Sequence, residues 1–235
     1  MRHLLEPPPA APPLPAEQVP SAYRYWRWRL LVTTFVGYAV YYFVRKNISV
    51  ALPLMEKDLG VRKQDLGVFL TLNDLCYGVS KFVNGMVGDR TNPRYFMAVG
   101  LALSALVNVF FGLSSGLVTL GVFWILNGWF QGMGFPPCAR ILAHWFSPHE
   151  RGVWWGVWNT SHQVGLAIIA LLAGWLAHHY GWRAAFLGPA LIALAVALYL
   201  AHQLRDTPAS LGLPPVEEFH GGPRSEEDQA QPVGA

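Results

Sequence analysis

The chain has 235 residues, of which 53% are hydrophobic and only 13% are charged, and its formal net charge is +3. Soluble domains carry roughly twice that share of charged residues, and the 45 residues between Arg94 and Arg140 carry no charge at all. This composition excludes a soluble domain, and because the basic residues gather in predicted loops, the positive charge does not indicate nucleic-acid binding.

Six apolar segments follow a proline-rich tail, and each is long enough for a membrane-spanning helix of roughly 20 residues. They run from about 29 to 54, 66 to 87, 95 to 113, 117 to 139, 152 to 177 and 183 to 204. We therefore predict an all-α membrane protein in which 24–205 form a six-helix transmembrane bundle. Residues 1–23 and 206–235 are predicted to be disordered and cytoplasmic, because they are rich in proline and polar residues.

The basic residues that flank the spans predict the orientation of the bundle, because Lys and Arg accumulate on the cytoplasmic side of a membrane. One side holds Arg24, Arg27, Arg29, Arg90, Arg94, Arg140, Arg151 and Arg205, and the other holds Lys57, Arg62, Lys63 and Arg183. The eight-to-four distribution places both termini in the cytoplasm, as an even number of spans requires.

Three basic residues remain inside the predicted spans, namely Arg45, Lys46 and Lys81. A charge at the centre of a bilayer costs on the order of 2.5–3.5 kcal/mol, so such a residue must face a cavity, a partner or the membrane interface. Helical spacing places Tyr38 and Tyr42 on the face of Arg45.

Further polar residues lie on the second and fifth spans. Asp74 and Tyr77 share the face of Lys81, and Asn159 lies three residues before His162. If these faces meet, they form a positive cavity for an anion, in which Arg binds phosphate bidentately and Tyr and Asn donate hydrogen bonds. In the alternative, Arg45 and Lys46 extend outward to the interface and Lys81 pairs with Asp74 as structure.

Loops and glycines add two further patterns. A tight cytoplasmic turn contains Gly85, Asp89, Arg90 and Arg94. It suits a conformational lock between helix bundles, or, in the alternative, its arginines are ordinary basic residues that flank a span on the cytoplasmic side. Residues 149–152 occupy the matching place three spans later, which suggests a three-plus-three internal repeat. Two glycine pairs with small-xxx-small spacing, at 128 and 132 and at 152 and 156, predict close helix packing.

Several of these motifs resemble known families. The turn at 85–90 resembles the cytoplasmic loop motif of the major facilitator superfamily. Residues 41–47, 77–82, 128–138, 205–208 and 212–215 resemble the organophosphate:phosphate antiporter family, which contains glycerol-3-phosphate and hexose-phosphate transporters and a hexose-phosphate sensor. The likeness covers about residues 24–219, and residues 80–85 and 154–155 are more similar to the hexose-phosphate branch.

The resemblance implies the N-terminal half of a major facilitator fold, with a three-plus-three inverted repeat. It implies that Arg45 grips the substrate phosphate, and that His162 is the family's fifth-helix histidine near the substrate. Phe135 departs from the tryptophan that is more usual before the Pro-Pro pair. Taken together, the expected substrate-binding residues are Arg45, Lys46, Lys81, His162, Tyr38, Tyr42, Tyr77 and Asn159.

The function that the resemblance implies is exchange of phosphorylated sugars or other organophosphates for inorganic phosphate across a bacterial inner membrane. Family members have twelve spans, whereas this chain stops in the central loop, so a second six-helix half is expected from another chain or a second copy. A membrane sensor for hexose phosphate that signals to a two-component kinase, and a truncated transporter without activity, stay open. Neither an enzyme nor a metal or cofactor is expected, because no nucleophile–base pair or metal-ligand cluster is recognisable.

Overall fold

The computed structural model describes residues 6–60 and 63–219, and all the regular elements within these ranges are helical. Residues 1–5, 61–62 and 220–235, which include parts of both predicted tails, lie outside the described residues. The long helices are α2 (Val19–Leu59), α3 (Lys63–Gly88), α4 (Pro93–Leu113), α5 (Leu117–Gln131), α6 (Phe135–Trp145), α7 (Pro148–Asn159), α8 (Ser161–Tyr180) and α9 (Ala184–Gln203). A 3-10 turn (Pro208–Leu211) and the short helix α10 (Val216–Phe219) follow.

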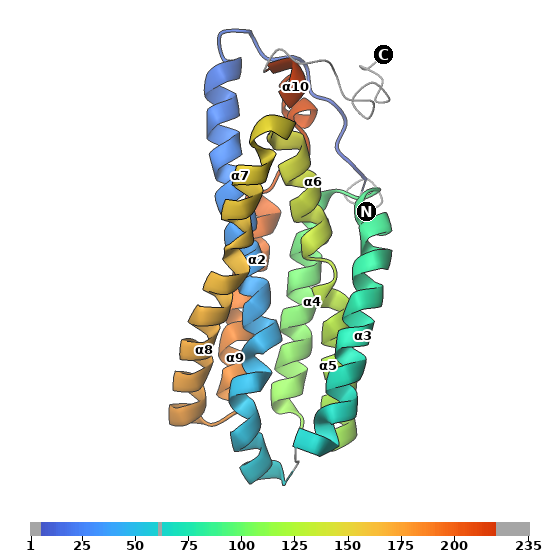
Figure 1. Cartoon of the computed structure of the whole chain (residues 1–235), viewed down its shortest axis with the longest axis vertical. Coiled ribbons are helices and arrows are strands. Elements are labelled where there is room, and N and C mark those ends of the chain that lie inside the picture. Colours follow the sequence, from blue (N-terminus) through green and yellow to red (C-terminus); the bar gives the residue numbers. More distant parts are fainter. Residues whose placement is uncertain (1–5, 61–62, 220–235) are drawn as a thin grey trace.

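The long helices run side by side along the long axis of the molecule (Figure 1). α4 packs between α9 and α5, α2 packs against α8 and α9, and α3 packs on α5. α2 begins and α9 ends at the same end of the bundle, at the top of Figure 1, where α10 also lies. The predicted all-helical class is confirmed, although α2 is longer at both ends than the predicted first span.

Two of the predicted spans are interrupted. The fourth divides into α5 and α6 around residues 132–134, and α6 begins with Pro136 and Pro137 in its first turn. Proline is tolerated there because its missing N–H would have no helical partner. The fifth divides into α7 and α8 at Thr160.

Among the described residues, three stretches are long and apolar enough to cross a membrane, judged by length and composition: Pro93–Leu113, Pro148–Tyr180 and Ala184–Gln203. The predicted count of six is therefore not confirmed. α5 falls short because it has only 15 residues before the break, and α2 and α3 carry the charged residues Arg45, Lys46, Asp74 and Lys81.

A buried network of asparagines joins the centre of the bundle. Asn47 donates to Asn108 Oδ1 over 3.0 Å and to the carbonyl of Ala185 over 3.1 Å. Asn108 and Asn127 both donate to the carbonyl of Val44, over 2.9 and 2.8 Å. Because buried polar groups need partners in an apolar surrounding, this network fixes α2, α4, α5 and α9 in one register.

Glycines allow the helices to approach closely at some of the predicted positions. A Cβ on Gly128 would lie 2.7 Å from the carbonyl oxygen of Asn73, and one on Gly132 would lie closer than 3.0 Å to Ser80. The packing predicted for this pair is thus confirmed, against α3. Gly152 and Gly156 have no atom within 4 Å of the same position, so that pair packs on nothing among the described residues.

The segments outside the long helices form an end cap, which we define as residues 6–15 together with 206–219. Ala11 N–H donates to the carbonyl of Ala209 over 2.9 Å, and Leu14 N–H donates to that of Gly212 over 2.8 Å. Within the described residues, these two segments, for which the sequence predicts disorder, are thus held by long-range backbone hydrogen bonds. Such bonds are not visible in composition, because the partners lie almost 200 residues apart (209 − 11 = 198).

Candidate functional site

The predicted site is built around the ring of Tyr77 on α3. The guanidinium carbon of Arg45, from α2, lies 3.8 Å from the centroid of the Tyr77 ring and 5.5 Å from that of Tyr42. Such a cation over an aromatic face is attracted by the ring quadrupole. This contact brings together the two faces that helical spacing predicted separately.

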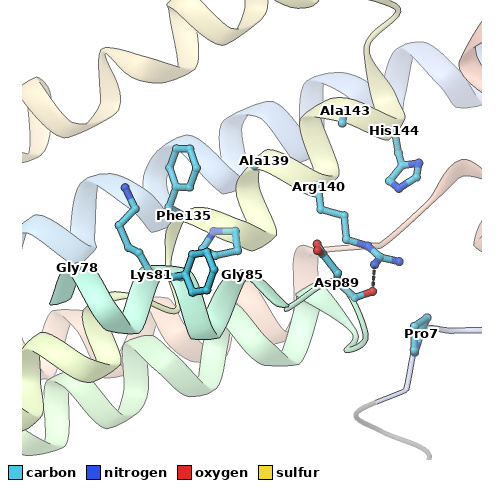
Figure 2. Close-up of a pocket in the computed structure, with 12 residues that line it drawn as sticks. Pro7, Gly78, Lys81, Gly85, Asp89, Phe135, Ala139, Arg140, Ala143 and His144 are labelled. Carbon is cyan, nitrogen blue, oxygen red and sulfur yellow. Dashed lines mark hydrogen bonds between the residues drawn. The ribbon is translucent and has the colours of Figure 1, made fainter. Parts of the chain in front are cut away.

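Lys81 approaches the same ring from α3 itself. Its amino nitrogen lies 5.6 Å from the centroid of the Tyr77 ring and 4.5 Å from that of Phe135. Figure 2 shows the Lys81 and Phe135 side chains next to each other. Phe135 is the first residue of α6, so the break between α5 and α6 positions this aromatic side chain over the lysine.

Aromatic rings from four helices surround the two cations. The Tyr38 ring lies 5.8 Å from Tyr42 and 4.8 Å from Trp158. The Phe135 ring lies 6.0 Å from both Trp155 and Trp158. Neither tryptophan was singled out from the sequence as a site residue, although the close spacing of Trp154, Trp155 and Trp158 was a signal for an aromatic wall.

Within the part of the chain that the structure describes, the two cations have no acidic partner. Among the described residues, no ion pair includes Arg45 or Lys81, and Asp74, the acid predicted as a possible partner for Lys81, is exposed. Both cations are half-buried. Because a charge removed from water needs compensation, this arrangement favours an anionic ligand over a structural ion pair.

The remaining predicted residues are placed differently. The His162 ring lies 5.6 Å from the Tyr42 ring, at the edge of the cluster, and its Nε2 lies 3.1 Å from Gln163 Nε2. Lys46 and Asn159 are exposed. Among the described residues, no ion pair or cation–π contact joins the side chain of either to Arg45, Tyr77 or Lys81. Their roles, like those of the other site residues, stay predictions.

A cavity of about 960 Å³ extends from this cluster toward the end of the bundle that carries the end cap. Lys81 and Phe135 line one part of it, and Asp89, Arg140 and His144 line another (Figure 2). Gly78 and Gly85 form part of the wall, and a Cβ on either would meet nothing within 4 Å. The cavity is therefore open beside α3 and leads from Lys81 to the surface.

At the predicted loop motif, the structure adds a partner that the sequence did not indicate. Arg140 donates to the backbone carbonyl of Asp89 (Figure 2) and makes a bidentate ion pair with Asp206, with distances of 2.9 and 3.0 Å. The Asp206 side chain is only 1% exposed, and Trp145 Nε1 donates to its backbone carbonyl. From the sequence, Arg140 was interpreted only as a basic residue that flanks a span. Asp206, a lone acid directly after the last predicted span, was a signal for such an ion pair.

The other members of the loop motif are dispersed. Arg90 is exposed, and the Nε of Arg94 donates to the carbonyl of Ala201 at the end of α9. The contacts among described residues thus join Arg140 to the backbone of Asp89 and Arg94 to the end of α9. The lock itself stays a prediction.

Comparison with known proteins gives a match to the Major Facilitator Superfamily over residues 34–231. The chain is 48% identical over 207 residues to the probable hexose phosphate transport protein of Chlamydia pneumoniae, covering 88% of this chain and 46% of that protein. It is 45% identical over 213 residues to the membrane sensor protein UhpC of Escherichia coli (strain K12), covering 90% of this chain and 48% of that protein. The chain spans about half the length of these curated relatives.

Among solved structures, the fold is similar to that of a bacterial homologue of the human lysosomal transporter Spinster in an inward-facing, unoccupied conformation. The TM-score is 0.69 at 19% sequence identity, over 78% of this chain and 44% of the other. At that identity the likeness concerns the fold alone, and it agrees with the helical arrangement described above.

Proposed function

The chain belongs to the Major Facilitator Superfamily, in its organophosphate:phosphate antiporter branch, and from this membership we propose that it forms one wall of a membrane transporter for phosphorylated sugars. The observation that carries the proposal is the pair of half-buried cations, Arg45 and Lys81, that flank Tyr77 without an acidic partner among the described residues. The 48% identical relative named as a probable hexose phosphate transport protein supports the substrate class.

The chemistry of the cluster suits a phosphate monoester. A guanidinium offers parallel N–H donors that match two phosphate oxygens, and an ammonium adds a compact charge. The rings of Tyr38, Phe135 and Trp158 offer apolar faces on which the carbon skeleton of a sugar can rest. Binding and conformational change are the whole mechanism of such a protein, so no catalytic residue is required.

In the proposed transport cycle, a sugar phosphate and inorganic phosphate compete for the same cations, and exchange follows from their differential binding in inward-open and outward-open states. We propose that six segments cross the bilayer, with α5–α6 and α7–α8 each acting as one, and that both termini are cytoplasmic. Transport by rocking requires a second six-helix unit that supplies the opposite wall.

The surface that would receive this second unit lies on α3 and α7, which also carry Lys81 and Trp158. Gly78, Gly85, Gly152 and Gly156 are open on these helices, and Phe82 and Val153 are 73% and 69% exposed. Small residues allow another helix to approach closely in lipid. A unit that packs on this face would close the open side of the cavity.

A second function is supported by one comparison. The relative at 45% identity is named as a membrane sensor protein, and a receptor for hexose phosphate would need the same cations without net transport. The chain would then bind the sugar phosphate and pass a conformational change to a partner kinase.

The test measures binding of hexose 6-phosphate to the chain in lipid nanodiscs by calorimetry. Arg45→Ala removes charge-assisted hydrogen bonds of about 1.5–3 kcal/mol, so we expect affinity to fall about 10- to 150-fold. Lys57→Ala, in the last turn of α2 and exposed, is the control and should change affinity much less. Equal losses in both variants would contradict the site, and unchanged affinity in Arg45→Ala would contradict phosphate binding at this cluster.

Transport and sensing are separated in proteoliposomes that contain the chain together with its six-helix complement. Uptake of labelled hexose phosphate driven by internal phosphate is expected for the antiporter. Binding of hexose phosphate without any such uptake would favour the sensor.

A further inference from the structure

Three arginines from three different elements lie close together at the end of the bundle that carries the end cap. The guanidinium carbons of Arg29 and Arg205 lie 4.7 and 5.3 Å from the centroid of the Trp26 ring. Arg94, at the start of α4, donates its Nε to the carbonyl of Ala201 near the end of α9. We call Arg29, Arg94 and Arg205 the arginine cluster.

The arginine cluster lacks a counter-ion among the described residues. Among the described residues, the ion pairs at this end of the bundle are Arg27–Glu150, Arg140–Asp206 and Arg151–Glu217, and none includes a member of the cluster. Arg183–Asp58 lies at the opposite end. Arg205 is held by the carbonyls of His202 and Leu204, and the Nε of Arg29 is buried without a hydrogen-bond partner. The members repel one another: burial, and then the charges of Arg94 and Arg29, lower the pKa of Arg205.

This arrangement differs from ordinary basic flanking. A flanking arginine that serves only to orient the chain extends into water, as the exposed Arg90 does. Arg29, Arg94 and Arg205 are instead half-buried and packed on rings and carbonyls. Three cations kept together at that degree of burial require a negative charge from outside the described residues.

A shallow groove of about 860 Å³ lies between α2 and α9, and Arg29 of the arginine cluster is part of its lining. Its lining is Ser21, Arg24, Tyr25, Trp28, Arg29, Val32, Tyr199, His202 and Gln203. Along α2 the aromatic and basic side chains of the lining alternate, and Val32 lies beyond Arg29 toward the middle of the bundle. Trp28 is 55% and Val32 is 49% exposed. No residue of this lining belongs to the cavity at Lys81.

We propose that this groove binds an anionic phospholipid, with the headgroup phosphate at Arg24 and Arg29, close to the other two arginines of the cluster, and an acyl chain along Val32 and Tyr199. Guanidinium groups suit a phosphodiester, and basic pockets between helices on the cytoplasmic side are the usual place for such headgroups. A lipid is chosen over free phosphate because the groove continues into exposed apolar side chains, which a soluble anion would leave uncovered. The proposal needs only that the bundle lies in a membrane with this end at its surface.

The test is native mass spectrometry of the detergent-purified chain with added phosphatidylglycerol or phosphatidylcholine. We expect retention of phosphatidylglycerol over phosphatidylcholine. Removing two of the basic charges, in Arg29→Gln/Arg205→Gln, should weaken binding about 30-fold. Arg90→Gln, which removes an exposed charge from the same end, is the matched control and should retain the wild-type affinity.

Three outcomes would overturn the proposal. Equal retention of both lipids would deny headgroup recognition, and an equal loss in Arg90→Gln would mean unspecific surface attraction. Displacement of phosphatidylglycerol by excess inorganic phosphate would assign the cluster to a free anion. Should the double variant fail to fold, Val32→Asn, at an exposed position, tests the acyl contact: weaker phosphatidylglycerol binding supports the groove, and unchanged binding contradicts it.

Discussion

At the scale of residues, the aromatic ring of Tyr77 organises the proposed binding site. The ring contacts Arg45 from α2 and Lys81 from its own helix, so one side chain holds two cations that would otherwise repel each other. The ring face neutralises part of that repulsion while leaving the N–H groups of both cations free to meet an anion. We therefore propose that Tyr77 is a positioning residue, separate from the groups that would bind the phosphate.

This role predicts a difference between two substitutions of Tyr77. Tyr77→Phe keeps the ring and should retain most of the affinity for hexose 6-phosphate. Tyr77→Leu loses the cation–π contact of about 0.5–2 kcal/mol, so affinity should fall about 2- to 30-fold. Calorimetry in nanodiscs measures both, and an equal loss in the two variants would show that the hydroxyl acts on the ligand instead.

The sequence predicted part of this site and could not have predicted the rest. Helical spacing within one span places Tyr42 with Arg45, and Tyr77 with Lys81, and the structure brings these two faces together. Spacing says nothing about neighbours on other helices, so Trp155 and Trp158 were missed as wall residues, and Phe135 was noted only as a departure from the family's tryptophan. The same limit hid the buried contacts of Asn47 with Asn108, because the two residues lie in different spans.

At the scale of elements, glycines decide which helices touch. Gly165 on α8 lies against the backbone of Ala39 on α2, where a Cβ would come closer than 3.0 Å to the carbonyl oxygen. Because backbone cannot yield as a flexible side chain does, α2 and α8 can pack at this distance only with glycine there. Gly156 on α7 has no atom within 4 Å of the same position.

We therefore expect Gly165→Ala to destabilise the bundle and Gly156→Ala to leave it unchanged. The predicted cost for Gly165→Ala is about 1–3 kcal/mol, as for other overpacked positions. Unfolding in SDS-containing mixed micelles, followed by tryptophan fluorescence, measures both variants. Equal stability of the two proteins would contradict the close contact between α2 and α8.

The opposite end of the bundle is tied by Asp58 at the end of α2. Its carboxylate accepts from Trp182 Nε1 over 2.8 Å and from Arg183 over 3.1 Å, and Arg183 also donates to Ser115 Oγ. These contacts join α2, the turn between α4 and α5, and the start of α9. The hydrogen bonds from Trp182 and Arg183 lower the pKa of Asp58 below its ordinary value.

A group whose pKa is lowered on folding stabilises the fold above its unfolded pKa, and this contribution disappears as the pH falls through the lowered value. Asp58→Asn should therefore lower the midpoint of thermal unfolding at neutral pH, and the difference from wild type should vanish in acid. Differential scanning fluorimetry over a pH series checks this. A difference that is constant with pH would exclude a role for the charge.

At the scale of the whole molecule, composition alone was sufficient to predict an all-helical membrane protein. The sequence motifs were sufficient to predict its family. Neither could reveal the end cap, because its contacts join the two ends of the described chain. Arg140 and Asp206 connect this cap to the cavity, since Arg140 lines the cavity and also pairs with the buried acid.

Breaking this ion pair from one side should release the cap. Arg140→Met leaves the Asp206 carboxylate buried without its partner, which costs about 3–5 kcal/mol for a buried pair. We expect faster proteolysis within 206–219, measured by mass spectrometry of the fragments. Arg151→Met removes a weaker pair, with Glu217 at 4.0 Å, and should change the cleavage rate little. Equal cleavage in both variants would contradict the locking role of Asp206.

The hydrogen bonds between residues 11 and 209 and between 14 and 212 also impose an order on biosynthesis. The partners of the N-terminal segment are translated almost 200 residues after it, which at ribosomal speed is about 10–40 s later. During that interval residues 6–15 have no partner in the cap, and α2 to α9 are already emerging for insertion. The cap can therefore close only on a chain in which α9 has already been made.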